Sequence, residues 1–293
     1  MTRQTGANAP TSHPANDLQD YVDRFEGRLS AADKKIIRVL TGEPMSGAML
    51  TARETAAAAG VHPASVVRLV QKLGFAGFAD FKAFARGYFL NQENPSLRVR
   101  SSLTQDAEKS ILQSLVEREA ALLLELPKWI EQTAIDRTVA MIRAARRCVV
   151  LGHGHGSDLA SLFARRLMRS GYDARALGHS DWQLCDALTL CGEGDLAILI
   201  VMREAPPGIG NVVTEIQARG CRVVALGDLN ALTLEPEPDL SLGAPRGPGQ
   251  KSQTLTAPMA IVNTLILELA RQDDGASLAA LDRLSSLKKA LVK

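Results

Sequence analysis

Hydrophobic residues in the first third of the chain recur at intervals of three and four, the spacing of one face of a helix. This pattern predicts three short helices, at 31–40, 52–59 and 64–73. Gly60 and Pro63 lie between the second and the third, where glycine is typical of a helix end and proline of a helix start. Two short helices joined by a tight turn that contains glycine form a helix-turn-helix.

Residues with short polar side chains mark where these helices begin. Ser30 is a good N-cap for the first helix. Thr51 and Glu54 give the second helix a T-x-x-E capping box, in which each side chain accepts a hydrogen bond from the other residue's backbone N–H. The third helix is expected to end at Gly74.

Aromatic residues are concentrated just after the third helix, where 75–89 holds six of the twelve in the chain. Their spacing is again that of one helical face. The stripe consists of Phe75, Phe78, Phe81, Phe84 and Tyr88. We interpret it as the core of a small separate domain and not as a surface that stacks on bases.

The segment 91–103 is polar and interrupted by Pro95, which is typical of a linker. Two longer helical patterns follow at 104–126 and 135–145, separated near Pro127. The first has an apolar stripe that suits a connecting helix packed on the next domain or on a partner chain.

The hydrophobic pattern changes after residue 147. Four short apolar runs predict buried strands, at 148–151, 174–177, 196–202 and 222–226. Helical patterns alternate with them, one of which follows the glycine loop GHGHGS. Alternating strands and helices predict a parallel sheet covered on both faces, a doubly wound α/β domain. Such sheets bind their ligands outside the carboxyl ends of the strands.

The pattern divides the chain into parts, the last of which is a packing helix indicated by leucines at three-residue spacing (Leu278, Leu281, Leu284 and Leu287). The expected parts are a disordered tail at 1–20, a helix-turn-helix domain at 21–92, a linker with connecting helices at 93–146, an α/β domain at 147–270 and a C-terminal helix at 271–293.

The composition of the 293 residues, 46% hydrophobic and 23% charged, is that of a soluble globular protein. No run approaches the roughly 18 apolar residues of a membrane span, and the polar N-terminus lacks signal-peptide features, so we expect a cytoplasmic protein with no membrane partner. The four cysteines match no zinc or redox spacing and are expected to be reduced thiols, three or four of them buried.

The net charge of +2 is unevenly distributed. Residues 1–100 hold 13 Lys and Arg against 9 Asp and Glu, a net charge of +4, and the remainder is mildly acidic. A basic front part favours that part as the site of any polyanion.

The segment 29–90 resembles the DNA-binding domain of RpiR/MurR-type transcriptional regulators. The residues that carry this resemblance are AGVHPASVVRLVQKLGFAGFADFKAF, at 59–84. The second half resembles the sugar isomerase (SIS) domain that the family places after its helix-turn-helix. The resemblance covers about residues 20–270 and implies an all-α helix-turn-helix domain followed by a doubly wound, flavodoxin-like α/β SIS domain.

Two loops depart from the pattern of the family. The first loop of SIS domains is G-x-G-x-S, whose serine holds a phosphate, whereas Gly156 stands at that position here and a serine comes only at Ser157. The second phosphate loop, usually S-x-S-G-x-T, falls on 201–206, VMREAP, which contains no hydroxyl. We therefore expect the usual phosphosugar loop to be degraded, since hydroxyl and N–H groups are what cradle a phosphate.

The predicted DNA contacts lie on and beside the third helix. Ser65 and Arg68 share the face that a recognition helix presents to base edges, and arginine can bind both acceptors of a guanine. Thr51 and Lys72 suit phosphate contacts. His62 stands where the family has a capping serine and is expected to cap less well. The full predicted set is Thr51, His62, Ser65, Arg68, Gln71 and Lys72.

The predicted ligand contacts come from loops at the carboxyl ends of the strands: Gly154, His155, Gly156, Ser157, His179, Asp181, Arg203, Glu204, Ser252 and Thr254. A divalent metal bound by His153, His155, His179 and Asp181 is an alternative. Because loop histidines more often bond to backbone or to an organic ligand, we expect neither a metal nor a cofactor.

Together these features predict a transcriptional regulator, most simply a repressor, that binds a palindromic operator in double-stranded DNA as a homodimer or homotetramer. Its SIS-like domain would dimerise and sense a small carbohydrate-related effector, a sugar or a sugar phosphate. Two alternatives stay open: a SIS domain that serves only as a ligand-free dimerisation scaffold, and a sugar-phosphate isomerase. No base for proton transfer stands out in 250–265, so we expect no enzyme.

Overall fold

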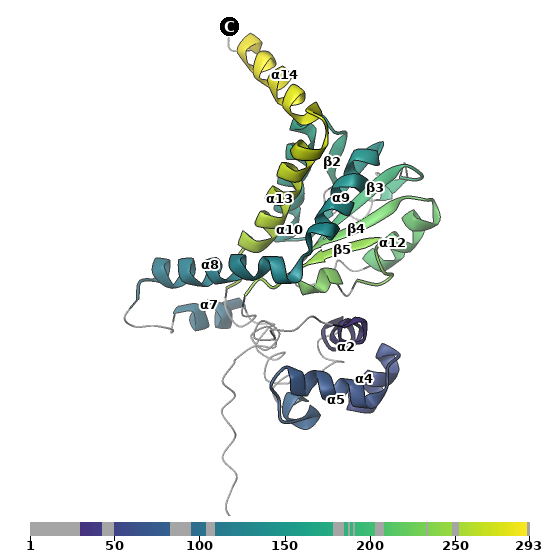
Figure 1. Cartoon of the computed structure of the whole chain (residues 1–293), viewed down its shortest axis with the longest axis vertical. Helices are drawn as coiled ribbons and strands as arrows, with labels where there is room; N and C mark the ends of the chain where they lie inside the picture. The colour runs from purple at the N-terminus through teal and green to yellow at the C-terminus, as the bar shows by residue number, and fades with distance from the viewer. Residues whose placement is uncertain are drawn as a thin grey trace, which may run out of the picture.

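A computed structural model gives the fold of the chain. It describes residues 30–42, 50–82, 95–103, 109–177, 185–186, 188–189, 191–202, 208–232, 234–247 and 252–291. Figure 1 shows short helices at one end of the molecule, a helix-covered sheet in the middle and a long helix at the opposite end.

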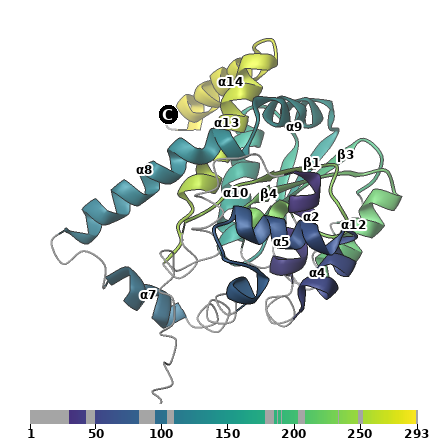
Figure 2. The same cartoon turned by 60° about the horizontal axis from the view of Figure 1, so that its bottom comes forward.

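The N-terminal part contains the helix-turn-helix expected from the sequence. Its described helices are α2 (Ala31–Gly42), α4 (Ala52–Ala59) and α5 (Pro63–Lys72). They lie against one another (Figure 2). Their shared small core consists of Ile36, Ile37, Leu40, Ala56, Ala59, Val66, Leu69, Val70, Leu73, Phe75 and Phe81. Phe75 and Phe81 meet edge to face with ring centroids 5.2 Å apart, so this part of the aromatic stripe is core, as predicted. Phe84 and Tyr88 lie outside the described residues.

The predicted helix caps are present. Thr51 Oγ1 accepts from the Glu54 N–H at 3.3 Å, and Glu54 Oε2 accepts from the Thr51 N–H at 2.7 Å. Ser30 and Asp33 form the same reciprocal pair at the start of α2, with distances of 3.1 and 3.0 Å. Gly60 ends α4 with φ of +61°, a left-handed conformation that glycine adopts without strain. Local sequence therefore sets the boundaries of these helices.

The connecting region differs from the expectation in two places. The polar segment around Pro95, expected as a linker, contains helix α7 (Pro95–Leu103). Proline favours the first position of a helix, where its missing N–H costs no hydrogen bond. Helix α8 (Ile111–Trp129) begins after its N-cap Ser110 and not at the predicted residue 104. It continues through Pro127, near its C-terminal end, and the Ile130 N–H still bonds to the Leu126 carbonyl at 3.0 Å. Helix α9 (Gln132–Ala144) follows as predicted.

The second half is built on a five-stranded, fully parallel sheet with the order β2-β1-β3-β4-β5. The strands are β1 (Arg147–Gly152), β2 (Ala174–Leu177), β3 (Asp195–Val201), β4 (Arg222–Gly227) and β5 (Leu240–Gly243). The first four match the predicted strands within a residue, and β5 was not predicted. This strand order is the flavodoxin-like one, which reverses direction between β1 and β3.

Helices cover both faces of the sheet, because side chains of each strand alternate between two cores. Helix α9, α10 (His155–Arg169) and α13 (Thr256–Gln272) pack on one face, where Cys148, Val150 and Ile198 point. Helix α12 (Ile209–Ala218) packs on the other, where Val149, Leu151 and Leu199 point. The fold class expected from the sequence is thus confirmed: an all-α helix-turn-helix followed by a doubly wound α/β domain.

The two parts touch each other along one side of the sheet domain. Helix α2 lies against the 3-10 helix η1 (Leu229–Leu232), which follows β4. Trp129 at the end of α8 and Leu229 of η1 are half-buried against the core of the helix-turn-helix.

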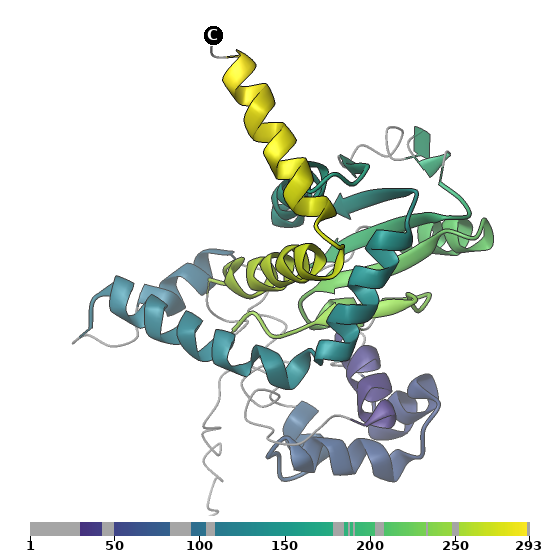
Figure 3. The ribbon, with the colours of Figure 1, turned by 45° about the horizontal axis from the view of Figure 1, so that its top comes forward.

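The C-terminal helix α14 (Ala276–Leu291) extends away from the sheet, as Figures 1 and 3 show. Only Ser277 and Ala280 near its start are buried. Leu278, Leu281, Leu287 and Leu291 are exposed. The leucine stripe predicted to pack therefore faces solvent within one chain, except for Leu284, which is half-buried.

Three of the four cysteines are buried, Cys148, Cys191 and Cys221, whereas Cys185 is exposed, and all four are free thiols as expected. Among the described residues, the helices are all too short or too polar to cross a bilayer.

Candidate DNA-binding face and ligand cavity

Helix α5 has one buried and one exposed face. Val66, Leu69 and Val70 enter the core, whereas Arg68 and Gln71 are exposed on the outside. The predicted DNA-contacting residues are exposed except for Ser65, which is half-buried. The structure thus brings this set together on and beside one helix.

The start of α5 is organised by two side-chain hydrogen bonds. His62 is the N-cap, and its Nδ1 accepts from the Ala64 N–H at 3.2 Å, so histidine takes the place of the capping serine. Arg68 Nη2 donates to Ser65 Oγ at 3.2 Å. Ser65 and Arg68 therefore form a polar pair in the first turns of the helix.

Lys72 lies at the other end of α5 and joins it to α2. Its Nζ lies 3.2 Å from Asp33 Oδ2, whose carboxylate is buried. Burial opposes ionisation of Asp33, but hydrogen bonds from Ser30 and Lys72 outweigh it and lower the pKa of this carboxyl. Lys72 thus has a structural contact as well as an exposed position.

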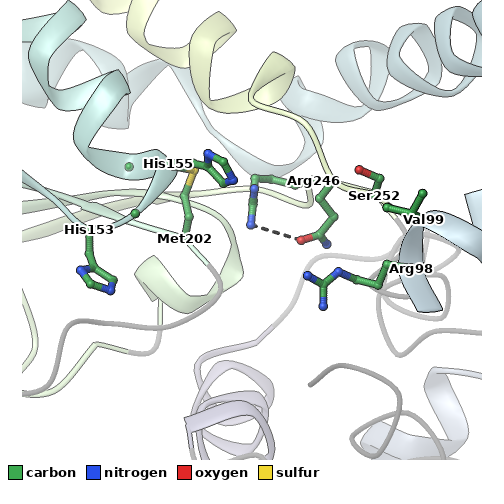
Figure 4. A pocket seen from close by; sticks show the side chains of 10 residues that line it. Arg98, Val99, His153, His155, Met202, Arg246 and Ser252 are labelled. Carbon is green, nitrogen blue, oxygen red and sulfur yellow. Dashed lines mark hydrogen bonds between the residues drawn. The ribbon is translucent and has the colours of Figure 1, made fainter. Parts of the chain in front are cut away.

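A cavity of about 360 Å³ opens at the carboxyl edge of the sheet, a volume in the range of small-molecule sites (Figure 4). The described lining comes from the loops after β1, β3 and β5 and from helix α7. These residues are Arg98, Val99, His153, Gly154, His155, Gly156, Met202, Arg246, Ser252 and Gln253. The sheet reverses direction between β1 and β3. The cavity therefore occupies the place where such sheets bind ligands.

The glycine loop after β1 brings backbone close to the cavity. Gly154 caps α10 with φ of +52°, which favours glycine. A Cβ on Gly156 would lie 3.2 Å from the Ile200 carbonyl oxygen, so a larger residue here would be tight. Ser157 is not part of the described lining, because its hydroxyl turns back and donates to the Gly154 carbonyl at 2.7 Å.

Arg246 organises the wall of the cavity next to β5. It is buried, and its Nε donates to Asp228 Oδ2 at 3.1 Å. Its Nη2 donates to Gln253 Oε1 at 3.2 Å, the bond that is dashed in Figure 4, and its Nη1 donates to the Thr254 carbonyl at 3.4 Å. Buried charges need such partners, and the hydrogen bonds from Arg246 also join the segment 252–254 to this wall.

The predicted ligand residues divide into three groups. Gly154, His155, Gly156 and Ser252 line the cavity. Ser157 and Thr254 lie beside it with their hydroxyls engaged elsewhere, that of Thr254 donating to Glu119 Oε2 at 2.7 Å. Outside the described residues lie His179, Asp181, Arg203 and Glu204.

Sequence reasoning missed Arg98, Val99, Met202, Arg246 and Gln253 in the lining. Met202 and Arg246 follow the carboxyl ends of β3 and β5, so recognition of both strand ends could have indicated them. Arg98 and Val99 belong to α7, which the sequence pattern predicted as a linker.

The part of the chain that the structure describes holds no group of three or more His, Cys, Asp or Glu placed to bind a metal ion. Figure 4 shows His153 and His155 with their rings pointing in different directions. The other two residues of the metal hypothesis lie outside the described ranges.

Residues 17–92 match the family of helix-turn-helix domains described as rpiR family. An Escherichia coli K12 protein described as the uncharacterized HTH-type transcriptional regulator YfhH is 29% identical over 164 residues, which is 55% of this chain. The chain spans 58% of the length of that relative in this match.

Two solved structures resemble this chain. One is the sugar isomerase domain of an RpiR transcription factor from Sphaerobacter thermophilus, which is 22% identical and superposes with a TM-score of 0.55. The match covers 61% of the present chain and 99% of the Sphaerobacter domain. The other is the Vibrio vulnificus NanR protein complexed with ManNAc-6P, which is 18% identical and superposes with a TM-score of 0.56. The match covers 94% of the present chain and 98% of the NanR chain.

These similarities confirm the resemblance inferred from the sequence. Residues 17–92 are a helix-turn-helix domain of the rpiR family, and the sheet domain that follows has the fold of the sugar isomerase (SIS) domain of an RpiR transcription factor.

Proposed function

We propose that this chain is a DNA-binding transcriptional regulator whose SIS-like domain senses a small carbohydrate-related molecule. The observation that carries the proposal is the combination in one chain of an exposed, polar α5 face and a ligand-sized cavity at the carboxyl edge of the sheet. The rpiR-family match of residues 17–92 supports the DNA-binding part. Such a regulator acts on DNA in the cytoplasm.

The regulator acts as a repressor and as a homodimer or homotetramer. One short recognition helix reads only a few base pairs, whereas two helices related by a two-fold axis read a palindrome with half-sites roughly 34 Å apart. Release from the operator on effector binding requires that the effector bind the two states of the protein with different affinities.

The proposed effector is a sugar or a sugar phosphate. The cavity volume fits a molecule of that size, and the similar NanR structure contains ManNAc-6P. SIS domains hold a phosphate with a serine at the position that is Gly156 in this chain. The effector is therefore bound through groups other than a serine hydroxyl at this position.

We propose no catalytic role for the cavity. Aldose–ketose isomerisation needs a base held close to the sugar carbons. Within the described lining the candidates are His153 and His155, whose rings diverge, and no carboxylate is present there. An assay of the purified chain for interconversion of aldose and ketose phosphates tests this, and turnover that is lost in His155→Ala would contradict it.

The first test is DNA binding by the full chain, with genome-wide mapping of bound sites to find the operator. Arg68→Ala should weaken binding to that operator by roughly 1–3 kcal/mol and spare non-specific DNA, because a base contact is lost while phosphate contacts persist. Arg222→Ala, which removes an exposed arginine from the sheet domain, is the matched control. Equal loss on all DNA sequences would reassign Arg68 to a phosphate contact.

The second test separates a sensor from a dimerisation scaffold. Thermal unfolding of the full chain is followed with ManNAc-6P, other sugar phosphates, neutral sugars and divalent metals. A sensor shows a rise in melting temperature with at least one carbohydrate, because a ligand that binds only the folded state stabilises it. No shift with any compound, with operator binding intact, would favour the scaffold.

A further inference from the structure

Helix α7 forms one wall of the cavity, although it precedes the sheet domain in the chain. Arg98 and Val99 of this helix line the cavity together with the loops that follow β1 and β3. Figure 4 shows the Arg98 side chain extending from its helix toward the side of the cavity where Arg246 lies. The cavity is therefore complete only when α7 lies against the sheet domain.

We propose that α7 is part of the ligand site, where Arg98 binds an anionic group of the effector, and that bound effector holds α7 on the sheet domain. The anionic group is a phosphate or a carboxylate, since both offer oxygen pairs that a guanidinium binds with two parallel hydrogen bonds. This inference rests on the proposed sensing function and names the charge of the effector and the residue that recognises it.

The charge of the described lining supports an anion. It contains two guanidinium groups, those of Arg98 and Arg246, and no carboxylate. Arg246 is buried and hydrogen-bonded to Asp228, Gln253 and the Thr254 carbonyl, so its donors serve the protein itself. Arg98 comes from α7 in the connecting region, so an anion bound between Arg98 and the loops of the sheet domain would contact both of these parts of the chain.

Hydrogen bonds join α7 to the same segment that Arg246 holds. Ser102 Oγ donates to the Arg98 carbonyl at 2.9 Å and accepts from the Ser252 N–H at 2.9 Å. The position of Arg98 is thus fixed relative to Ser252, which also lines the cavity.

Helix α8 contacts this segment as well. Arg118 Nη2 donates to the Ser252 carbonyl at 3.3 Å, and Glu119 accepts from the Thr254 hydroxyl at 2.7 Å. The segment 252–254 is therefore the place where α7, α8 and the cavity meet. Because α7 lies in the chain between the helix-turn-helix and α8, a ligand that retains α7 acts on the segment that positions the DNA-binding domain.

The test measures binding of three probes to the full chain by calorimetry at constant ionic strength: ManNAc-6P, inorganic phosphate and neutral ManNAc. We expect both anions to bind and ManNAc-6P to bind better than ManNAc. Arg98→Gln should weaken ManNAc-6P binding about tenfold or more, the loss of one charge-assisted contact. Arg98→Lys, which keeps the charge without the paired donors, should lose less.

Arg100→Gln is the matched control, since it removes the same charge from an exposed position of the same helix that is not in the described lining. Its affinity for ManNAc-6P should stay within about twofold of the unmodified chain. Circular dichroism of each variant shows whether the fold is kept.

Hydrogen exchange gives a second readout that a purely structural role of Arg98 would not change. ManNAc-6P should slow amide exchange in 95–103 in the unmodified chain and in Arg100→Gln, but not in Arg98→Gln. Unchanged exchange in this helix on saturation with the probe would overturn the proposal.

The remaining outcomes separate this inference from the proposed function. Equal weakening by Arg98→Gln and Arg100→Gln would show a general charge effect and overturn the role of Arg98. Tight binding of neutral ManNAc that is insensitive to Arg98→Gln would leave sensing intact and overturn the anionic contact. If neither anion binds, the anion site is wrong, and operator binding by the same preparation decides separately whether the chain is a regulator.

Discussion

Gly152 ends β1 at the point where the first turn of α10 crosses over it. A Cβ built on this residue would lie 2.2 Å from the Gly156 carbonyl oxygen and 2.8 Å from the Ser157 nitrogen. Both atoms belong to backbone, which cannot rotate away as a side chain can. The glycine is therefore required by close packing of the strand end on the helix that begins the cavity loop.

Gly152→Ala should destabilise the chain by about 1–3 kcal/mol, the usual cost of overpacking, because the first turn of α10 must shift. Urea unfolding followed by circular dichroism measures this. Gly77→Ala is the control, since a Cβ there meets nothing within 4 Å. A Gly152→Ala chain that unfolds at the same urea concentration as the control would show that the loop can adjust.

Helices α2 and α5 are joined by apolar packing and by the contact of Asp33 with Lys72. The pKa of Asp33 is lowered in the folded chain. A carboxyl with a lowered pKa stabilises the fold above its unfolded value of about 3.9, and this contribution is lost as the pH falls through the lower, folded value. The helix-turn-helix should therefore weaken in acid partly through this one group.

Lys72→Met should cost about 1 kcal/mol at pH 7, a modest amount because the lysine side chain is 45% exposed and its charge is screened. The cost should shrink below pH 4 as Asp33 becomes protonated. Urea unfolding at several pH values measures both effects, with the exposed Lys35→Met on α2 as control. A cost that is independent of pH would show that Lys72 acts through packing of its methylene groups alone.

Local signals made most elements predictable from the sequence. The capping residues Thr51 and Ser30 define where α4 and α2 begin, and continuous apolar runs define β1 to β4. Strand β5 was missed because it has four residues and follows a proline-rich segment and a 3-10 helix in place of a full crossover helix. Helix α7 was missed because a proline such as Pro95 is typical both of a break between elements and of the first residue of a helix.

These missed elements explain what was missed in the cavity. Arg246 comes just after β5, and Arg98 lies on α7, so neither could be placed at the carboxyl edge of the sheet without the element that carries it. The glycine loop after β1 was placed correctly because its strand and helix were both evident. The motif places Ser157 in this loop but does not determine where its hydroxyl points, and the hydroxyl bonds to the backbone of its own turn.

Helix α14 relates the single chain to the proposed assembly. It is anchored by Ala280, whose Cβ lies close to Gly171, and by Ser277, which bonds to Asp273. On its other side the helix presents Leu278, Leu281 and Leu287 to solvent. An isolated helix of this length is marginal in water, and a row of exposed leucines marks an interaction surface.

We predict that a second copy of the chain covers this leucine row, because most homo-oligomers form by two-fold pairing of the same surface. Leu281→Arg combined with Leu287→Arg should convert the chain to monomers, since two buried charges at a two-fold contact lie close to their own copies. Sedimentation equilibrium measures the mass. Affinity for a palindromic operator should fall together with the mass, because a monomer reads one half-site.

The control for this variant is Leu124→Arg on α8, which is also an exposed leucine. If the interface lies on α14, Leu124→Arg keeps the mass and the operator affinity of the unmodified chain. If Leu124→Arg dissociates the protein and the α14 variant does not, the two copies pair through α8. In that case the connecting helices, and not the C-terminus, would set the spacing of the two recognition helices.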